Sequence, residues 1–153
     1  MANKPTFNIE HAHKYFSANC FNMAWDLIDK PDRTSEDDEQ MIRLTQSSLW
    51  HWTQRSDCKD KNLSIGCWQA SRVYALLGQA GNARKYAQLC LDKSPKGDRF
   101  CLGYAYEALA RAELIAENAE TAQEHLAKAW QHAEAVPDDE NKQLLVNDLK
   151  TLA

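Results

Sequence analysis

The chain has 153 residues, of which 44% are hydrophobic and 26% are charged, and its formal net charge is −4. This composition is typical of one globular domain with a sizeable core. The acidic balance argues against nucleic acid as a partner, because proteins that bind it usually carry a basic face. The apolar run at residues 73–77 is far too short to span a bilayer, so we expect no membrane association either.

Cysteine usage and the start of the chain predict a cytoplasmic location. Five cysteines occur, an odd number, and no C-x-x-C pair is present, which is typical of reduced and mostly buried thiols. The chain opens without the basic segment and apolar run of a signal peptide. We therefore expect thiols rather than disulfides.

The first third of the chain predicts two helices that pair as a hairpin over residues 8–56. Apolar residues recur at helical spacing up to Pro31, which ends the pattern. Thr34 followed three residues later by Asp37 is typical of a capped helix start, and carboxylates favour the first turn of a helix. We interpret the acidic run there as part of this cap rather than as a metal site. The second helix is expected to reach Arg55.

Residues 62–94 predict a third and a fourth helix around a turn at Gly78. The third helix is apolar on nearly all sides, a pattern that indicates burial between neighbouring helices. Asn82 is expected to cap the fourth helix, and a loop around Pro95 follows that helix.

The last third of the chain predicts three more helices. Residues 99–136 supply a fifth and a sixth helix that are rich in alanine, which lets helix axes approach closely. Residues 138–153 supply a final helix with leucines on one side, as in a helix that caps a stack of repeats. The chain is therefore expected to be all-α, with about seven helices.

A helix–turn–helix pattern occurs twice, about 39 residues apart. The first copy has an aromatic residue at Tyr74, a turn glycine at Gly78 and a small residue at Ala83, and it closes at Pro95. The second copy keeps the small and apolar residues of its second helix but has Glu117 in place of the turn glycine. Such a unit cannot bury its apolar face alone, so neighbouring units must stack.

This pattern resembles the tetratricopeptide repeat family. The resemblance implies a single domain over residues 1–153, built as a short right-handed α-solenoid of antiparallel helix hairpins. Residues 8–56 then form a degenerate hairpin, residues 62–94 and 99–136 form two repeats, and residues 138–153 form a capping helix. The family holds a peptide or a partner helix in a concave groove and brings no catalytic residues. We therefore expect a non-catalytic protein–protein interaction module.

The densest aromatic and basic cluster indicates a partner-binding surface. It combines Trp50, His51 and Arg55 with Trp68 and Arg72 one helix further on. Trp and Arg are enriched among interface hot spots. On a helical wheel Trp50 lies opposite the apolar stripe of its helix. It either packs against the first helix or is exposed for a partner or a second copy of the chain, so homodimerisation is a further expectation.

Glu107 and Arg111 form an i, i+4 pair of favourable polarity inside an otherwise apolar stripe. One interpretation is a partly buried ion pair that fixes helix register. The other is a polar anchor in the groove that meets a ligand's carboxylate or ammonium group. Both residues are therefore candidates for partner binding.

Functions of other classes stay open as alternatives. No glycine-rich phosphate loop and no H-E-x-x-H motif occurs, and we expect no cofactor. His11 and His13 lie about 200° apart around a helix, so they can share one metal only with the help of another segment. His51 and Cys58 are the residues that could complete such a site, and an enzyme or metal-binding domain that uses His11, His13 and His51 is the alternative. A further hypothesis is a small-molecule pocket lined by aromatic side chains, namely Trp50, Trp68 and Tyr104.

Overall fold

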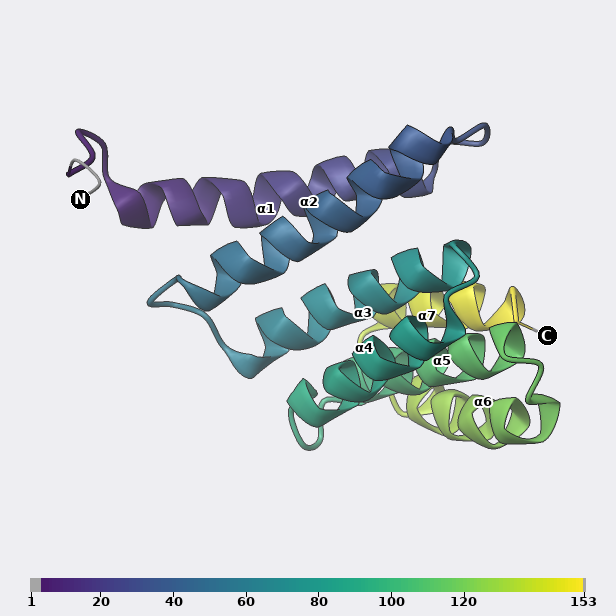
Figure 1. Ribbon diagram of the computed structural model, residues 1–153. Helices are drawn as coiled ribbons and strands as arrows, with labels where there is room; N and C mark the ends of the chain where they lie inside the picture. Colours follow the sequence, from purple (N-terminus) through teal and green to yellow (C-terminus); the bar gives the residue numbers. More distant parts are fainter. Residues whose placement is uncertain (1–3, 153) are drawn as a thin grey trace.

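The computed structural model describes residues 4–152, and within that range the chain forms seven α-helices and no strand (Figure 1). The helices are α1 (Ile9–Ile28), α2 (Ser35–Thr53), α3 (Asp60–Leu76), α4 (Ala80–Lys93), α5 (Arg99–Ile115), α6 (Ala119–Glu134) and α7 (Asp139–Lys150). The prediction of an all-helical chain with about seven helices is confirmed. Residues 1–3 and 153, which the expected domain includes, lie outside the described residues.

The helices pack mainly on their neighbours in the chain. The closest pairs are α1 with α2, α3 with α4 and α5 with α6, and α5 also packs on both α3 and α7. In Figure 1 the long α1–α2 pair lies along one side of the molecule, and α3 to α7 form a second, more compact group. The two groups are joined where α2 packs on α3. The row formed by α3, α5 and α7 carries the site described below.

The start of α2 follows its local sequence signal, whereas the start of α4 does not. The Thr34 hydroxyl accepts from the backbone N–H of Asp37 at 3.2 Å, and the Asp37 carboxylate accepts from the backbone N–H of Thr34 at 2.9 Å. This confirms the predicted capped start of α2. The prediction of Asn82 as the cap of α4 is wrong, because the helix begins at Ala80 with Gln79 at the N-cap. The preceding turn is so short that Asn82 already lies in the first helical turn.

The two repeat units share one turn geometry. Gly78 has a φ of 70°, and Glu117, which stands 39 positions later (117 − 78), has a φ of 61°. Both values lie in the left-handed region that favours glycine. In each unit the next residue donates its backbone N–H to the carbonyl five residues back, Gln79 to Tyr74 and Asn118 to Glu113, both at 2.9 Å. The sequence repeat is therefore also a repeat of backbone geometry.

Alanine makes up much of the core. Fully buried alanines lie where α3 to α6 touch one another, among them Ala83, Ala87, Ala105, Ala122 and Ala129. Leu145 and Leu149 of α7 are fully buried against α5 and α6, as expected of a terminal helix with an inward apolar face. Leu144, expected on the same side, is instead 56% exposed.

The cysteines are free thiols, and all except the half-buried Cys58 are buried. Burial raises the pKa of Cys67 and of Cys101 to about 11 and that of Cys90 to about 12. The prediction of mostly buried thiols is confirmed.

Candidate partner-binding groove

Four helices, α1, α3, α5 and α7, supply most of the lining of an apolar hollow of about 380 Å³. The main lining residues are large and apolar or aromatic, namely Phe21, Ile65, Trp68, Phe100, Tyr104 and Leu144. Ile65 and Leu144 are exposed to solvent. An apolar concavity with exposed large side chains is typical of a binding site for a ligand or a partner.

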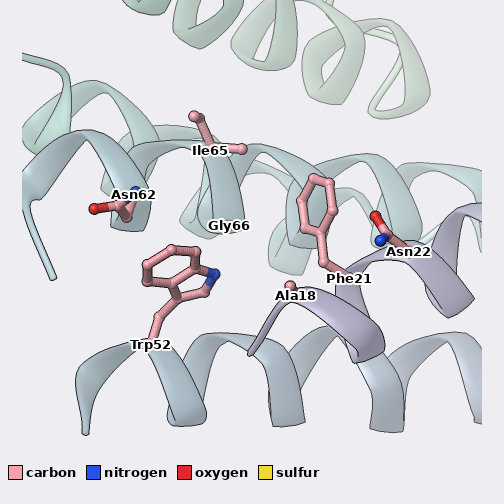
Figure 2. Close-up of a pocket in the computed structure, with 7 residues that line it drawn as sticks. All are labelled: Ala18, Phe21, Asn22, Trp52, Asn62, Ile65 and Gly66. Atoms are coloured by element: carbon pink, nitrogen blue, oxygen red, sulfur yellow. The ribbon is translucent and has the colours of Figure 1, made fainter. Parts of the chain in front are cut away.

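A smaller hollow of about 160 Å³ adjoins the first one between α1, α2 and α3 (Figure 2). The two hollows share Phe21 and Ile65. Figure 2 shows the half-buried Trp52 extending from its helix into the space toward Gly66. We call the two hollows together the groove.

Two aromatic side chains of the groove donate hydrogen bonds to acidic side chains. Trp68 and Tyr104 pack edge to face, with ring centroids 4.9 Å apart. The indole Nε1 of Trp68 donates to Glu107 at 2.9 Å, and the Tyr104 hydroxyl donates to Asp148 at 2.7 Å. Burial, and then the bond to Asp148, raises the pKa of Tyr104, so its hydroxyl stays a donor. These bonds fix the orientation of both rings.

A cluster of charged side chains lies beside Trp68. Glu107 is fully buried and accepts hydrogen bonds from Trp68 and from Arg111 Nε, the latter at 2.9 Å. Arg72 Nη1 lies 3.8 Å from the same carboxylate. Arg72 Nε and Nη1 are buried and donate to no acceptor within residues 4–152, although buried donors are normally satisfied. Burial, and then the charge of Arg111, lowers the pKa of Arg72.

The predicted ion pair between Glu107 and Arg111 is therefore present. Its fully buried carboxylate fits a pair that fixes helix register, and of the two side chains only Arg111, which is 16% exposed, stays accessible to a ligand. Arg72 and Arg111 stand 39 positions apart (111 − 72), the spacing of the repeated turn, and both approach Glu107. Two arginines thus share one carboxylate.

Trp50, His51 and Arg55 do not line the groove. They lie near the end of α2, where it meets the start of α1. Trp50 is 55% exposed, and its ring contacts those of His13 and His51 edge-on, with centroids 5.4 Å and 4.8 Å apart. Trp50 thus touches α1 while more than half of its side chain stays exposed. The structure divides the expected partner-binding residues into two separate groups.

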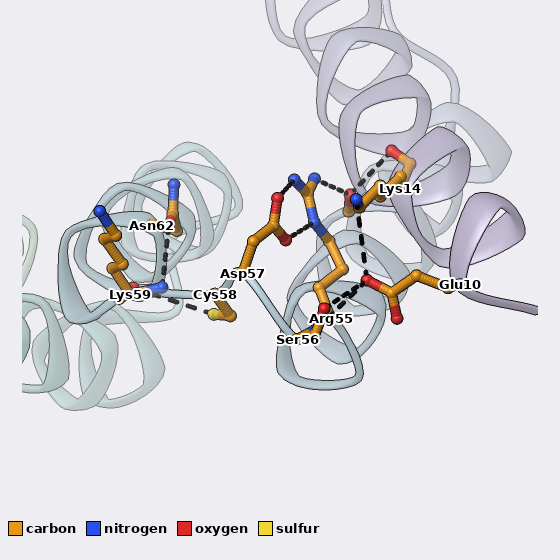
Figure 3. A network of polar contacts seen from close by, with 9 residues as sticks. Glu10, Lys14, Arg55, Ser56, Asp57, Cys58, Lys59 and Asn62 are labelled. Carbon is orange, nitrogen blue, oxygen red and sulfur yellow. Dashed lines mark hydrogen bonds and ion pairs between the residues drawn. The ribbon is translucent and has the colours of Figure 1, made fainter.

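Arg55 forms hydrogen bonds within the fold (Figure 3). Its guanidinium donates two bonds of 2.8 Å to Asp57 and one of 2.9 Å to Ser17 on α1, and it stacks over Trp52 at 3.7 Å. Hydrogen bonds from Arg55 lower the pKa of Asp57 to about 2. Figure 3 also shows Glu10 of α1 reaching the same loop. The network ties the α2–α3 loop to α1.

His13 and His51 meet, whereas His11 does not join them. The Nδ1 atoms of His13 and His51 lie 2.8 Å apart. His11 is exposed, and its backbone N–H serves the start of α1 by donating to Asn8. No group of three or more His, Cys, Asp or Glu side chains that could hold a metal ion occurs in the part of the chain that the structure describes. The expected three-histidine arrangement is therefore wrong, and two of its members form a pair.

Several residues of the groove were not among the candidates from the sequence. In the larger hollow they include Phe21, Ile65, Phe100 and Leu144, and Asp148, which accepts a hydrogen bond from Tyr104, was not a candidate either. Helical periodicity separates an apolar face from a polar one, but it does not distinguish side chains that fill the core from those that line a hollow. Trp68 and Tyr104 do meet in one hollow, as the small-molecule hypothesis expected, while Trp50 lies elsewhere.

No family model, no curated protein and no solved structure matches this chain. The resemblance to tetratricopeptide repeats therefore rests on the residues quoted above. Between residues 4 and 152, none of the helices has the length and apolarity that crossing a membrane requires.

Proposed function

We propose that this protein is a non-catalytic protein–protein interaction module whose helices stack as a short right-handed solenoid resembling tetratricopeptide repeats. The common turn geometry at Gly78 and Glu117 supports the repeat arrangement. The packing of α5 on both α3 and α7 supports it as well. In this arrangement the first helix of each hairpin faces the groove, and the groove binds a segment of the partner.

The main support for the proposal is the apolar groove. Its larger hollow of about 380 Å³ is lined almost entirely by apolar and aromatic side chains and has room for a bulky side chain of a peptide. Ile65 and Leu144 expose apolar surface that such a segment would cover, and covering apolar surface drives association.

The charged cluster adds a second feature to the proposed partner. Arg72 Nε and Nη1 lack an acceptor but are buried, so an incoming group would reach the exposed 20% of the side chain rather than these two atoms. A carboxylate arriving at the exposed edge of Arg72 would bring an acceptor of opposite charge, and charge-assisted hydrogen bonds are the stronger ones. The proposed partner segment therefore carries a bulky apolar side chain with an acidic residue close to it.

The way in which Glu107 is held favours binding over catalysis. Its carboxylate is fully buried and accepts hydrogen bonds from Trp68 and Arg111. A carboxylate surrounded by fixed donors is poorly placed to take a proton from a substrate. We also propose a cytoplasmic location, which the free, mostly buried thiols support.

Selection of peptides from a random displayed library tests this function with the full chain as the target. We expect the enriched peptides to share a bulky apolar residue and an acidic residue at a constant spacing. Leu144→Glu places a charge at the groove and should weaken their binding by at least about tenfold, because that charge loses solvent on binding. Leu89→Glu is the matched control, since Leu89 is an exposed leucine on α4 that does not line the groove.

Loss of binding in Leu144→Glu together with retention in Leu89→Glu supports the groove as the site. Equal binding by Leu144→Glu and the unchanged chain contradicts it, and so does an enriched pool without a shared motif. Arg72→Gln tests the acidic feature separately. This variant should no longer distinguish an enriched peptide from its analogue with Gln in place of the acidic residue. Circular dichroism checks that each variant keeps its helices.

A further inference from the structure

Two imidazoles from opposite helices of the first hairpin face each other. His13 lies near the start of α1 and His51 near the end of α2, and their ring centroids are 5.0 Å apart. Their Nδ1 atoms approach to 2.8 Å. At this distance one Nδ1 carries a hydrogen and donates it in a hydrogen bond to the other Nδ1. Neutral imidazole nitrogen is also a ligand for copper, nickel and zinc, so a metal ion bound to one side of the line between the two nitrogens can displace the shared proton and bind both.

We propose that His13 and His51 form a binding site for Cu(II), which also accepts Ni(II) more weakly. The distance between the two nitrogens selects the metal. At metal–nitrogen distances of about 2.0 Å, nitrogens 2.8 Å apart subtend an angle of about 90° at the metal. Neighbouring ligands in square-planar or tetragonal coordination, the geometry of Cu(II) and Ni(II), make this angle. Tetrahedral zinc would require a separation of about 3.3 Å, so the pair would have to open.

Aromatic side chains hold the two imidazoles in place. Phe16 packs on His51, with ring centroids 5.3 Å apart and planes tilted by 30°. Trp50 contacts both imidazoles edge-on. Side chains around a metal ligand restrict its orientation and so raise the affinity for the ion. The structure therefore restricts the position of both imidazoles.

Solvent supplies the remaining ligands of the proposed site. Neither a third histidine nor a cysteine or carboxylate joins the pair among the described residues. Both imidazoles are half-buried rather than enclosed, so water can reach the ion. The order of affinity for such a site follows the general order of the divalent metals, with copper above nickel and zinc.

Titration of the full chain with Cu(II), followed by calorimetry and tryptophan fluorescence, tests the site. We expect one equivalent of Cu(II) to bind and to quench part of the fluorescence, because Trp50 adjoins both ligands. His13→Gln and His51→Gln should each weaken binding by at least about tenfold. His11→Gln is the matched control, because His11 is an exposed histidine on the same helix and should leave binding unchanged.

Electron paramagnetic resonance of the unchanged protein gives an independent readout that needs no variant. We expect a tetragonal Cu(II) spectrum with coupling to two imidazole nitrogens. Three results overturn the proposal: no stoichiometric binding, equal binding by the His13→Gln or His51→Gln variant, or loss of binding in His11→Gln. Zinc binding as tight as copper binding overturns the choice of metal.

Discussion

Gly78 and Glu117 hold the same left-handed backbone conformation at equivalent places in two successive helix hairpins, with φ values of 70° and 61°. Each is followed by the same backbone hydrogen bond to a carbonyl five residues back. Glycine adopts this conformation without steric cost, whereas a residue with a Cβ atom does so at a cost. Glu117 therefore adopts this conformation at a steric cost that Gly78 does not bear.

This relationship predicts opposite effects of two substitutions. Glu117→Gly should raise the free energy of unfolding by about 0.5–1 kcal/mol, because it relieves the strain of the positive φ. Gly78→Ala should lower it by about 1 kcal/mol for the converse reason. Urea unfolding followed by circular dichroism measures both changes. Destabilisation by Glu117→Gly would show that its side chain contributes more than its backbone strain costs.

The charged cluster predicts that two arginines in equivalent positions respond differently to substitution. Arg111→Met removes a charge partner of the buried Glu107 and should cost about 3 kcal/mol of stability. Arg72→Met removes two buried nitrogen atoms, Nε and Nη1, whose N–H groups have no acceptor, so it should change stability by less than about 1 kcal/mol. Thermal and urea unfolding of the two variants test the contrast. Equal losses would mean that Arg72 supports Glu107 as strongly as Arg111 does.

Glu113 predicts a loss of stability in acid. Its carboxylate accepts hydrogen bonds from Arg84 and Asn118, and the bond from Arg84 is the main reason why its pKa falls from 4.5 to about 2. A pKa lowered by folding stabilises the protein fully above the unfolded value, and this stabilisation is lost as the pH falls through the folded value. Because Arg84 is 43% exposed, we expect only about 2 kcal/mol of stabilisation at neutral pH.

Glu113→Gln tests this prediction. The variant should be less stable than the unchanged protein at pH 7, and the difference should shrink below pH 4.5 and disappear near pH 2. Urea unfolding at a series of pH values gives the difference directly. Glu120→Gln, which changes an exposed carboxylate at the start of α6, is the control. A difference that stays constant with pH would contradict the assignment.

The exposed Trp50 predicts self-association. If it anchors a contact between two copies of the chain, Trp50→Ala should shift a dimer toward the monomer at low micromolar concentration, since buried tryptophan often dominates an interface. Sedimentation velocity measures the mass of each variant. Ile115→Ala, which shortens an exposed apolar side chain on α5, is the control. An unchanged mass in Trp50→Ala removes the case for this interface.

Features that depend on neighbouring residues in the chain could be predicted from the sequence. The capping pair of Thr34 and Asp37, the turn at Gly78 and the contact of Glu107 with Arg111 all act over a few residues. Local chemistry fixes such features before the helices pack. The outward position of Trp50 on its helix also followed from the helical period alone.

Contacts between helices could not be predicted, because they depend on how far one helix slides along another. His13 meets His51 because α1 and α2 pack in one particular register. The hydrogen bond that the Ser48 hydroxyl donates to the Ser17 carbonyl at 2.7 Å stabilises this register. A slide of one turn would separate the imidazoles by about 5 Å. No pattern within either helix specifies that register.

The lining of the groove comes from both ends of the polypeptide, since Phe21 belongs to the first helix and Leu144 to the last. An occupant that contacts both residues therefore joins the first helix to the last. Its binding free energy adds to the cooperativity of unfolding, because neither end can then detach alone. Occupancy should consequently be visible far from the groove, as slower amide exchange at the ends of α1 and α7 together.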